Sequence, residues 1–283
     1  MHINQSVSFL AIFLLLLSLS CVTAEETTIH VIDVGTGDAV LVESAGKYAL
    51  IDAGPGRNTT ADYLAGHNIS SLDLFLVTSM DHGKTGGILE VMNRTVVHDF
   101  RDNGAGGLYP QYARVLEKIK NESIPHSILT EGDLIPIGTD AAISVVPVNR
   151  SATGGYDEAV LKIIIGNISM LLLSQNGSPD ILDHDPIQIL RVPDHGSRRG
   201  YDAGFIHRLR PEVAVISAGR NGDGPNKATV MGLEAIGAEV YRTDLKGTIL
   251  IMTDGEKYRT GSSRSSPAGS ISLISVIETR PPG

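Results

Sequence analysis

Short apolar segments of strand length recur along the chain and predict a fold rich in β-sheet. Those of the first half are separated by turn residues and lie at 29–34, 39–43, 48–52 and 72–78. Those of the second half lie at 143–148, 159–165, 169–174, 187–192, 213–217 and 248–253. Apolar residues at helical spacing predict helices between these strands, at 60–66, 109–121, 203–208 and 227–236.

Two strand-rich halves with helices between the strands predict a protein of the α/β (α+β) class. Because each sheet must bury an apolar face, we expect two facing sheets covered by helices, a four-layer αββα sandwich. We assign this domain to residues 25–258. The remaining part, 259–283, begins with a Ser- and Gly-rich linker and ends with a short apolar run. That run is either an extra edge strand or the start of another module.

The N-terminal segment 1–24 predicts export. It contains no Asp, Glu, Lys or Arg, and an apolar run at 9–19 leads to the small residues Val22, Thr23 and Ala24. This pattern is typical of a signal peptide, and it predicts an extracytoplasmic protein, secreted or at the cell surface. The alternative is an uncleaved anchor, which would be the protein's only membrane contact.

Composition narrows the chemistry further. Cys21 is the only cysteine and lies in the predicted signal, so a cleaved chain has no disulfide, no thiolate ligand and no Cys nucleophile. The net charge of −9 and the absence of Trp disfavour nucleic acid as a partner, which leaves an unidentified small-molecule or protein ligand. Asn-x-Ser/Thr tripeptides are consistent with an exported glycoprotein and lie at Asn58, Asn68, Asn93, Asn121, Asn149, Asn167 and Asn176.

A polar loop after the apolar strand at 72–78 carries the most informative motif. The stretch 76–87 has the sequence LVTSMDHGKTGG. It resembles the metallo-β-lactamase-fold domain of ComEC-type DNA-uptake proteins, in which this loop has the pattern Thr-His-x-Asp-x-Asp-His-x-Gly-Gly. Other segments resemble the family in the same order: IDVGTGD at 32–38, LIDAG at 50–54, LLSQN at 172–176, VPDHGS at 192–197, SAGRN at 217–221 and YRTD at 241–244.

The resemblance implies a metallo-β-lactamase-type sandwich whose cleft holds two divalent metals for hydrolysis, as in phosphodiesterases or nucleases. The family's ligand positions differ here, however. Aligned without gaps, the loop has Ser79, Asp81, Gly83 and Lys84 where the family has His, Asp, Asp and His. Asn176 replaces a bridging Asp, and the pair Asp194-His195 replaces His-His. An amide binds transition metals poorly and an ammonium repels them, so we expect one metal at most, Zn or Mn, or none.

Lys84 suggests how the negative charge of the altered site is balanced. We predict that its ammonium group supplies positive charge where a metal stands in the family, pairing with Asp194 and with Asp52 or Asp81. The alternative is a solvated Lys on a loop. A residual metal site could use Asp81, Asp194 and His195, and the candidate catalytic residues are Asp81, Lys84 and His195. Further cleft candidates, several with plain structural alternatives such as loop capping, are Asp52, Ser79, His82, Asn176 and Asp244.

Two functions therefore compete. The first is an exported metallo-β-lactamase-fold protein whose site has lost most metal ligands and whose cleft binds a ligand or partner, with little or no turnover. The second is a metal-dependent hydrolase of the phosphodiesterase or nuclease class that works with one metal on a remodelled Asp/His site. Because both use the same fold, the fold alone cannot separate them.

Overall fold

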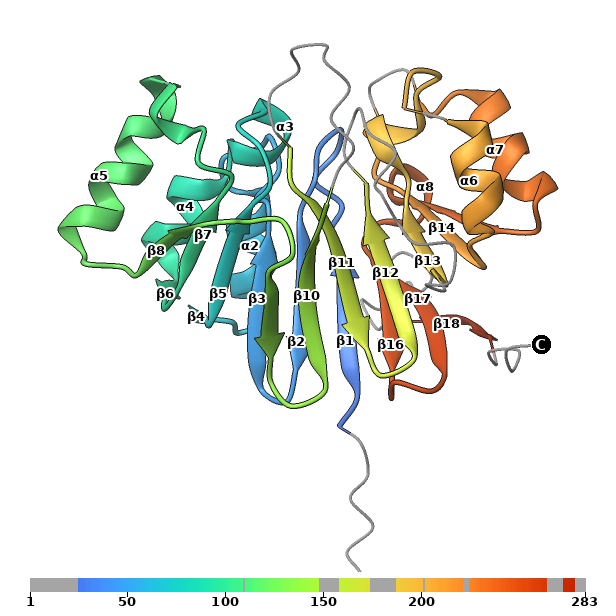
Figure 1. Ribbon diagram of the computed structural model, residues 1–283, viewed down its shortest axis with the longest axis horizontal. Coiled ribbons are helices and arrows are strands. Elements are labelled where there is room, and N and C mark those ends of the chain that lie inside the picture. Colours follow the sequence, from blue (N-terminus) through green and yellow to red (C-terminus); the bar gives the residue numbers. More distant parts are fainter. Residues whose placement is uncertain are drawn as a thin grey trace, which may run out of the picture.

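The computed structural model describes residues 25–108, 110–147, 158–173, 187–200, 202–220, 224–263 and 272–277. The predicted signal peptide 1–24 and Asn176 lie outside these residues. Two large sheets pack face to face, with helices on both outer sides (Figure 1). The four-layer αββα sandwich is therefore confirmed.

The first sheet contains nine strands among the described residues and is mixed. In spatial order these are β18 (Ser272–Ile277), β17 (Tyr258–Ser262), β16 (Ile249–Thr253), β1 (Thr27–Val31), β2 (Val40–Ser44), β3 (Lys47–Ile51), β5 (Leu74–Val77), β7 (Phe100–Asp102) and β8 (His126–Ile128). Its antiparallel part runs from β18 to β3, and its parallel part from β3 to β8.

The second sheet contains seven strands in the described part of the chain. In spatial order these are β15 (Glu239–Arg242), β14 (Val213–Ile216), β13 (Ile189–Arg191), β12 (Ile168–Leu172), β11 (Val160–Ile165), β10 (Ala141–Val146) and β9 (Leu134–Ile137). The pairs from β12 to β15 are parallel. A small parallel pair joins β4 (Ser71–Leu72) to β6 (Val96–Val97).

Helices cover the outer face of each sheet (Figure 1). Those on the side of the first sheet are α2 (Thr59–Gly66), α4 (Ile88–Arg94) and α5 (Ala113–Asn121), and those on the side of the second are α6 (Ala203–Leu209) and α7 (Lys227–Ala235). Shorter helical turns are α3 (His82–Thr85), α8 (Thr243–Lys246), η1 (Gly106–Leu108), η2 (Pro110–Tyr112) and η3 (Pro193–Gly196). When the next strand is parallel to the previous one, the chain must return to the opposite edge of the sheet before that strand begins. Helices such as α2, between the parallel strands β3 and β5, make this crossover.

Side-chain alternation explains the layers. On β1, Ile29 and Val31 belong to the core between the two sheets, and on β2 and β3, Leu41 and Leu50 belong to the core beneath the helices. A third core lies between the second sheet and α6 and α7. Strands buried on both faces are apolar almost throughout, which is why their sequences are nearly continuous apolar runs.

The C-terminal part differs from the sequence prediction. Strand β17 passes through the domain boundary expected at residue 258, and β18 pairs with it antiparallel, so the first sheet continues into the predicted tail. Of the two alternatives for the final apolar run, the structure has the edge strand. Among the residues described, none of the helices is both long enough and apolar enough to cross a membrane.

Candidate functional site

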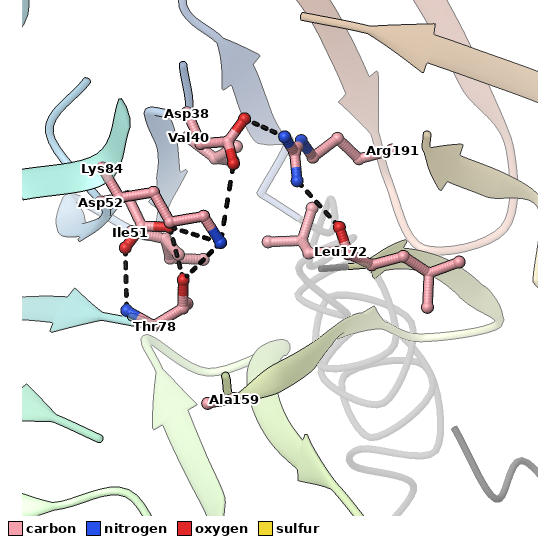
Figure 2. A pocket seen from close by; sticks show the side chains of 10 residues that line it. Asp38, Val40, Ile51, Asp52, Thr78, Lys84, Ala159, Leu172 and Arg191 are labelled. Atoms are coloured by element: carbon pink, nitrogen blue, oxygen red, sulfur yellow. Dashed lines mark hydrogen bonds and ion pairs between the residues drawn. The ribbon is translucent and has the colours of Figure 1, made fainter. Parts of the chain in front are cut away.

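The site lies where loops leave the carboxyl ends of parallel strands in both sheets. In open α/β sheets this edge gathers polar side chains from segments that are distant in sequence. The loops after β3 and β5 bring Asp52 and the segment Thr78 to Lys84 to the site. The end of β13 contributes Arg191, and the turn before β2 contributes Asp38. Figure 2 shows these side chains converging.

Asp52 is held at the end of β3 in an unusual backbone conformation. Its φ of 59° lies in the left-handed region, which few residues other than Gly adopt. Its carboxylate accepts two hydrogen bonds from Thr78, one from the backbone N–H at 2.8 Å and one from the hydroxyl at 2.7 Å. The strained backbone conformation therefore coincides with a fixed orientation of the buried Asp52 carboxylate toward Thr78, which follows the neighbouring parallel strand β5.

Lys84 lies on the short helix α3 and is almost fully buried, with 4% of its surface exposed. Its Nζ donates to Glu158 Oε1 at 2.5 Å and to the Thr78 hydroxyl at 3.0 Å. Nζ also lies 3.6 Å from Asp38 Oδ2 and 3.8 Å from Asp52 Oδ2. The predicted pairing with Asp52 is present, but the predicted pairing with Asp194 is not, because Asp194 instead accepts from the Ser197 hydroxyl. The burial of Lys84 excludes the solvated-Lys alternative.

Gly86 and Gly87 bring α3 close enough for this contact. A Cβ on Gly86 would overlap the carbonyl of Pro55, and one on Gly87 would overlap the carbonyl of Ala53. The loop after β3 therefore packs directly on the loop after β5, and Ala53 N donates to Lys84 O at 2.8 Å. The two glycines of the motif thus serve close backbone packing.

Arg191 adds a second buried cation from the other sheet. It is 4% exposed, ion-paired through one guanidinium nitrogen with Asp38, and donates through the other to the Leu173 carbonyl at 2.8 Å. Asp38 therefore lies between the two cations, with one oxygen toward Arg191 and the other toward Lys84 (Figure 2). This carboxylate links the two sheets electrostatically.

The pKa shifts follow from burial opposed by the neighbouring charges. Burial raises the pKa of Asp52 to about 6, although Lys84 and the hydrogen bonds from Thr78 lower it. Burial on its own lowers the pKa of Lys84, but the carboxylates of Asp52 and Glu158 outweigh it and raise that pKa above its usual value. Burial lowers the pKa of Arg191 to about 10. At neutral pH, therefore, Lys84 and Arg191 are both charged.

Asp194 and His195 lie in a strained turn within η3. Their φ values are 46° and 53°, both left-handed. His195 Nδ1 donates to the Ser217 carbonyl at 3.0 Å, and Asp194 accepts from the Ser197 hydroxyl. Burial, followed by the charge of Arg191, lowers the pKa of His195. Its imidazole is therefore neutral at pH 7, with the proton on Nδ1.

The other predicted site residues have structural partners. Asp81 is exposed and caps α3 by accepting from Gly83 N at 2.7 Å, while Ser79 is buried and accepts from Asp81 N at 3.3 Å. His82 is exposed in the first turn of α3. Asp244 pairs with Arg242, with 2.6 Å between Oδ2 and the guanidinium nitrogen. Of the cleft candidates, Asp52 forms an ion pair with Lys84.

Comparison with known proteins agrees with this architecture. No family model matches the chain. ComE operon protein 3 of Bacillus subtilis (strain 168) is 24% identical over 256 residues, which are 80% of this chain. The match spans 33% of that protein's length. In solved structures, the metallo-β-lactamase-fold protein YhfI from Bacillus subtilis superposes with a TM-score of 0.57 at 10% identity, covering 81% of this chain and 100% of YhfI. This chain therefore has the metallo-β-lactamase fold and is ComEC-like in sequence.

Two further structures share the fold of this ComEC-like domain. A diphosphatase of the PhnP family superposes with a TM-score of 0.50 at 17% identity, over 80% of this chain and 98% of that one. Zn²⁺-bound PqqB from Methylobacterium extorquens superposes with a TM-score of 0.51 at 12% identity, over 75% of this chain and 97% of PqqB. The fold can therefore hold divalent metal, and the side chains in the cleft decide whether this chain does.

The donor set of the ComEC-like domain does not fit the two-metal centre of the family. Asp38, Asp52 and Glu158 are already paired with Lys84 or Arg191, and a divalent ion placed among them would face both cations. Among the described residues, no three His, Cys, Asp or Glu side chains are arranged to hold a metal ion. The predicted ligand set Asp81, Asp194 and His195 is thus not arranged as a metal site: Asp81 and Asp194 accept hydrogen bonds within their own turns, and His195 donates to the Ser217 carbonyl.

A small cavity remains at the centre of this network. It has a volume of about 10 Å³, and its polar lining is Asp38, Asp52, Thr78, Lys84 and Arg191. This is about the space of one water molecule. The charged side chains therefore leave room for about one water molecule at the centre of the network.

Sequence reasoning missed Asp38, Thr78, Glu158 and Arg191 as members of the site. A signal was present for Arg191, because it is a charged residue in an apolar strand segment and so requires a buried partner. Asp38 is the last residue of the IDVGTGD segment at 32–38, which resembles the family. Glu158 carries no local signal, since its role depends on packing against a segment 74 positions earlier in the chain.

Proposed function

We propose that this ComEC-like domain is an exported binding protein that does not carry out the hydrolysis implied by its fold. The observation that carries the proposal is the buried ammonium of Lys84, 2.5 Å from Glu158 and 3.8 Å from Asp52, inside the cleft. A hydrolytic metal pair in the cleft would lie beside that ammonium and would have to displace its charge.

The electrostatics support the same conclusion. Lys84 and Arg191 together provide two positive charges against the three carboxylates of Asp38, Asp52 and Glu158. That balance is nearly neutral, as a buried site requires. A pair of divalent ions would leave the same volume strongly positive. The presence of the two cations is therefore consistent with a cleft that holds no metal pair.

The ligand would meet the loops around the cleft, because the interior cavity is close to the size of a water molecule. Exposed groups on these loops include Asp81 and His82 from the first sheet and Arg198 and Arg199 from the second. Both signs of charge are present, and the net charge of the chain is −9. These features favour a protein or a polar small molecule over nucleic acid.

Export rests on the uncharged apolar segment at 1–24. Within the described residues, every asparagine of an Asn-x-Ser/Thr tripeptide is exposed, namely Asn58, Asn68, Asn93, Asn121 and Asn167. Glycosylation at these positions is therefore compatible with the folded domain. Mass spectrometry of the protein secreted by its host tests both points, and we expect a mature N-terminus at Glu25. Retention of the full chain inside the cell would contradict export.

Metal content and turnover test the non-hydrolytic proposal. We expect the purified protein to hold far less than one equivalent of Zn or Mn by plasma mass spectrometry. Its Tm should not change on addition of EDTA, and it should not hydrolyse bis(p-nitrophenyl) phosphate or p-nitrophenyl acetate in Mn²⁺ or Zn²⁺. Near-stoichiometric metal, with turnover that is lost in Asp81→Ala, would overturn the proposal.

The metal-dependent hydrolase remains the second candidate, and one observation favours it. His195 is neutral, and its Nδ1 donates to the Ser217 carbonyl at 3.0 Å, the arrangement that orients metal-bound imidazoles through their other nitrogen. Asp81→Ala and His195→Ala distinguish the two candidates. A hydrolase would lose turnover and metal in both variants, whereas in a binding protein neither measurement would change.

A further inference from the structure

The potential glycosylation sites lie unevenly over the two helical layers. Four of those in the described residues lie on or directly beside α2, α4 and α5, which cover the first sheet, and these are Asn58, Asn68, Asn93 and Asn121. A fifth, Asn167, lies in the turn between β11 and β12. The sequence has no Asn-x-Ser/Thr tripeptide after Asn176, so α6, α7 and α8 carry none. These helices lie on the other side of the molecule from α2, α4 and α5 (Figure 1), and glycans on the exported protein would leave that side uncovered.

The charge of the chain is divided in the same way. Residues 187–247 include the strands β13 to β15 and the helices α6 to α8, and they contain nine Lys and Arg against seven Asp and Glu. Their net charge is +2, so the rest of the chain carries −11. Among the described residues of this range, the exposed cations are Arg198, Arg199, Arg208, Arg210, Arg220 and Lys227, and the exposed carboxylates are Asp202, Glu234 and Glu239. The outer face of the second sheet is therefore positive on a negative protein.

Two of these cationic segments meet at the cleft edge of the second sheet. Asn226 N donates to the Gly196 carbonyl at 2.9 Å. The turn that continues into Arg198 and Arg199 therefore packs against the start of α7, where Lys227 is the first residue.

Two large apolar side chains lie near these cations and face solvent. Met231 follows Lys227 by four residues on α7, which places both on the same face of the helix, and it is 67% exposed. Leu245 lies on α8 and is 62% exposed, and α7 and α8 both pack against β15. We call Arg198, Arg199, Lys227, Met231 and Leu245 the α7 patch.

We propose that the α7 patch docks an acidic segment of a protein partner, one whose carboxylates are interspersed with apolar side chains. The carboxylates pair with the three cations, and the apolar side chains cover Met231 and Leu245. The proposal deepens the proposed binding function and rests on it, because it names the class of partner and the part of the cleft rim that receives it.

Charge complementarity selects an acidic partner. Arg198, Arg199 and Lys227 form no ion pair with any of the described residues, so their charges are open to incoming carboxylates. Elsewhere the protein carries −11, which repels an acidic segment and directs it to this face.

The apolar side chains distinguish a protein partner from other polyanions. Nucleic acids and acidic polysaccharides bind chiefly through rows of cations, and Met231 and Leu245 would contribute little to such a contact. Large apolar side chains bordered by charged ones are typical of protein interfaces. The combination therefore favours a peptide-like occupant with both kinds of side chain.

A random peptide library displayed on phage, selected on the purified full chain, tests this chemistry. We expect the enriched peptides to be rich in Asp and Glu with interspersed Leu, Ile, Phe or Met. Their affinity, measured by fluorescence anisotropy, should fall about tenfold in the double variant Arg198→Glu, Lys227→Glu, should fall in Met231→Ser, and should decrease with added salt. The matched controls are Arg114→Glu on α5 and Val96→Ser on β6, an exposed cation and an exposed apolar residue outside the patch, and both should bind as the wild type does.

Enrichment of peptides without acidic residues, or equal affinities in the patch and control variants, would overturn the docking surface. Tighter binding of heparin, single-stranded DNA or phosphatidylserine vesicles than of any enriched peptide would overturn it as well.

A glycan placed on the patch gives an independent test. Lys227→Asn creates an Asn-x-Thr tripeptide with Thr229, whereas Lys227→Gln removes the same charge without creating one. In protein secreted from a glycosylating host, Lys227→Asn should lose binding of the enriched peptide, and enzymatic removal of the glycans should restore it to the level of Lys227→Gln. Asn121→Gln, which removes a tripeptide on α5, should have no effect. Unchanged peptide binding with a glycan at position 227, verified by mass spectrometry, would contradict the proposal.

The two proposals fail differently. Near-stoichiometric metal and turnover in the wild-type protein would defeat the non-hydrolytic function, whatever the patch binds. A metal-free, inactive wild type whose peptide binding is indifferent to changes in the α7 patch would defeat the docking surface alone.

Discussion

Two buried titratable clusters respond to burial in opposite ways. In the cleft, Lys84 remains charged because carboxylates surround it, and its pKa is raised in spite of burial. Beneath α2, His30 is also buried, but burial, together with the charge of the neighbouring His67, lowers its pKa to about 4. Burial alone therefore does not decide the charge of a side chain; the partners within a few ångströms do.

The geometry explains the difference. His30 Nδ1 is 2.8 Å from the Tyr63 hydroxyl, while its Nε2 is 3.8 Å from Glu43 and has no hydrogen-bond partner within the described residues. Glu43 is partly exposed, so its carboxylate is also solvated. The cleft instead offers buried carboxylates in direct contact with Lys84. One cluster is stable when neutral and the other when ionised, and the following changes test this contrast.

The largest effect is expected from Arg191→Met. This change leaves Asp38 without its ion-pair partner and the buried Leu173 carbonyl without a donor, so we expect a loss of about 3 to 5 kcal/mol in the free energy of unfolding. Urea denaturation measures it. The matched control is Arg94→Met, because Arg94 is partly exposed and its partner Asp62 is exposed. A loss no larger than that of the control would show that the cleft network does not stabilise the fold.

An intermediate effect is expected from acid acting on His30. Its pKa is about 4 in the folded protein and 6.5 in the unfolded chain, so the unfolded chain binds the proton first. Stability should therefore fall as the pH decreases from 6.5 to 4, by about 3 kcal/mol in total from this group. The groups facing the ring are Glu43, Tyr63 and His67. Urea denaturation at a series of pH values measures the slope, and His30→Gln should reduce it. An unchanged slope in that variant would assign the acid sensitivity elsewhere.

The smallest effect is expected from Lys47→Ala. Lys47 and Asp73 form a 2.8 Å ion pair, but the Lys47 side chain is 54% exposed, so water screens the interaction. The expected loss is less than about 1 kcal/mol and should shrink further in high salt. Thermal unfolding at low and high salt measures it. A loss as large as that of Arg191→Met would remove the distinction between buried and surface pairs on which the comparison rests.

Much of the fold could be predicted from the sequence, because strands buried on both faces leave long apolar runs. The helix expected at 60–66 is α2 at Thr59–Gly66, and that expected at 203–208 is α6 at Ala203–Leu209. The elements that were missed are short or only half apolar, such as β7 and β8, which are parallel additions at one side of the first sheet. Their pairing depends on tertiary contacts more than on local pattern.

By itself, the sequence determined the apolar strands, the polar loop with Lys84 and the Gly86-Gly87 pair that follows it, and its resemblance to the family predicted that Lys84 stands where that family has a metal ligand. Only the tertiary structure decided the partners of that lysine. Glu158 and Asp38 come from segments 74 and 46 positions away from Lys84, and Arg191 reaches Asp38 from the opposite sheet. The physical reason is that a buried charge is balanced by the oxygens that packing brings within a few ångströms, and that proximity arises from sheet topology and not from order along the chain.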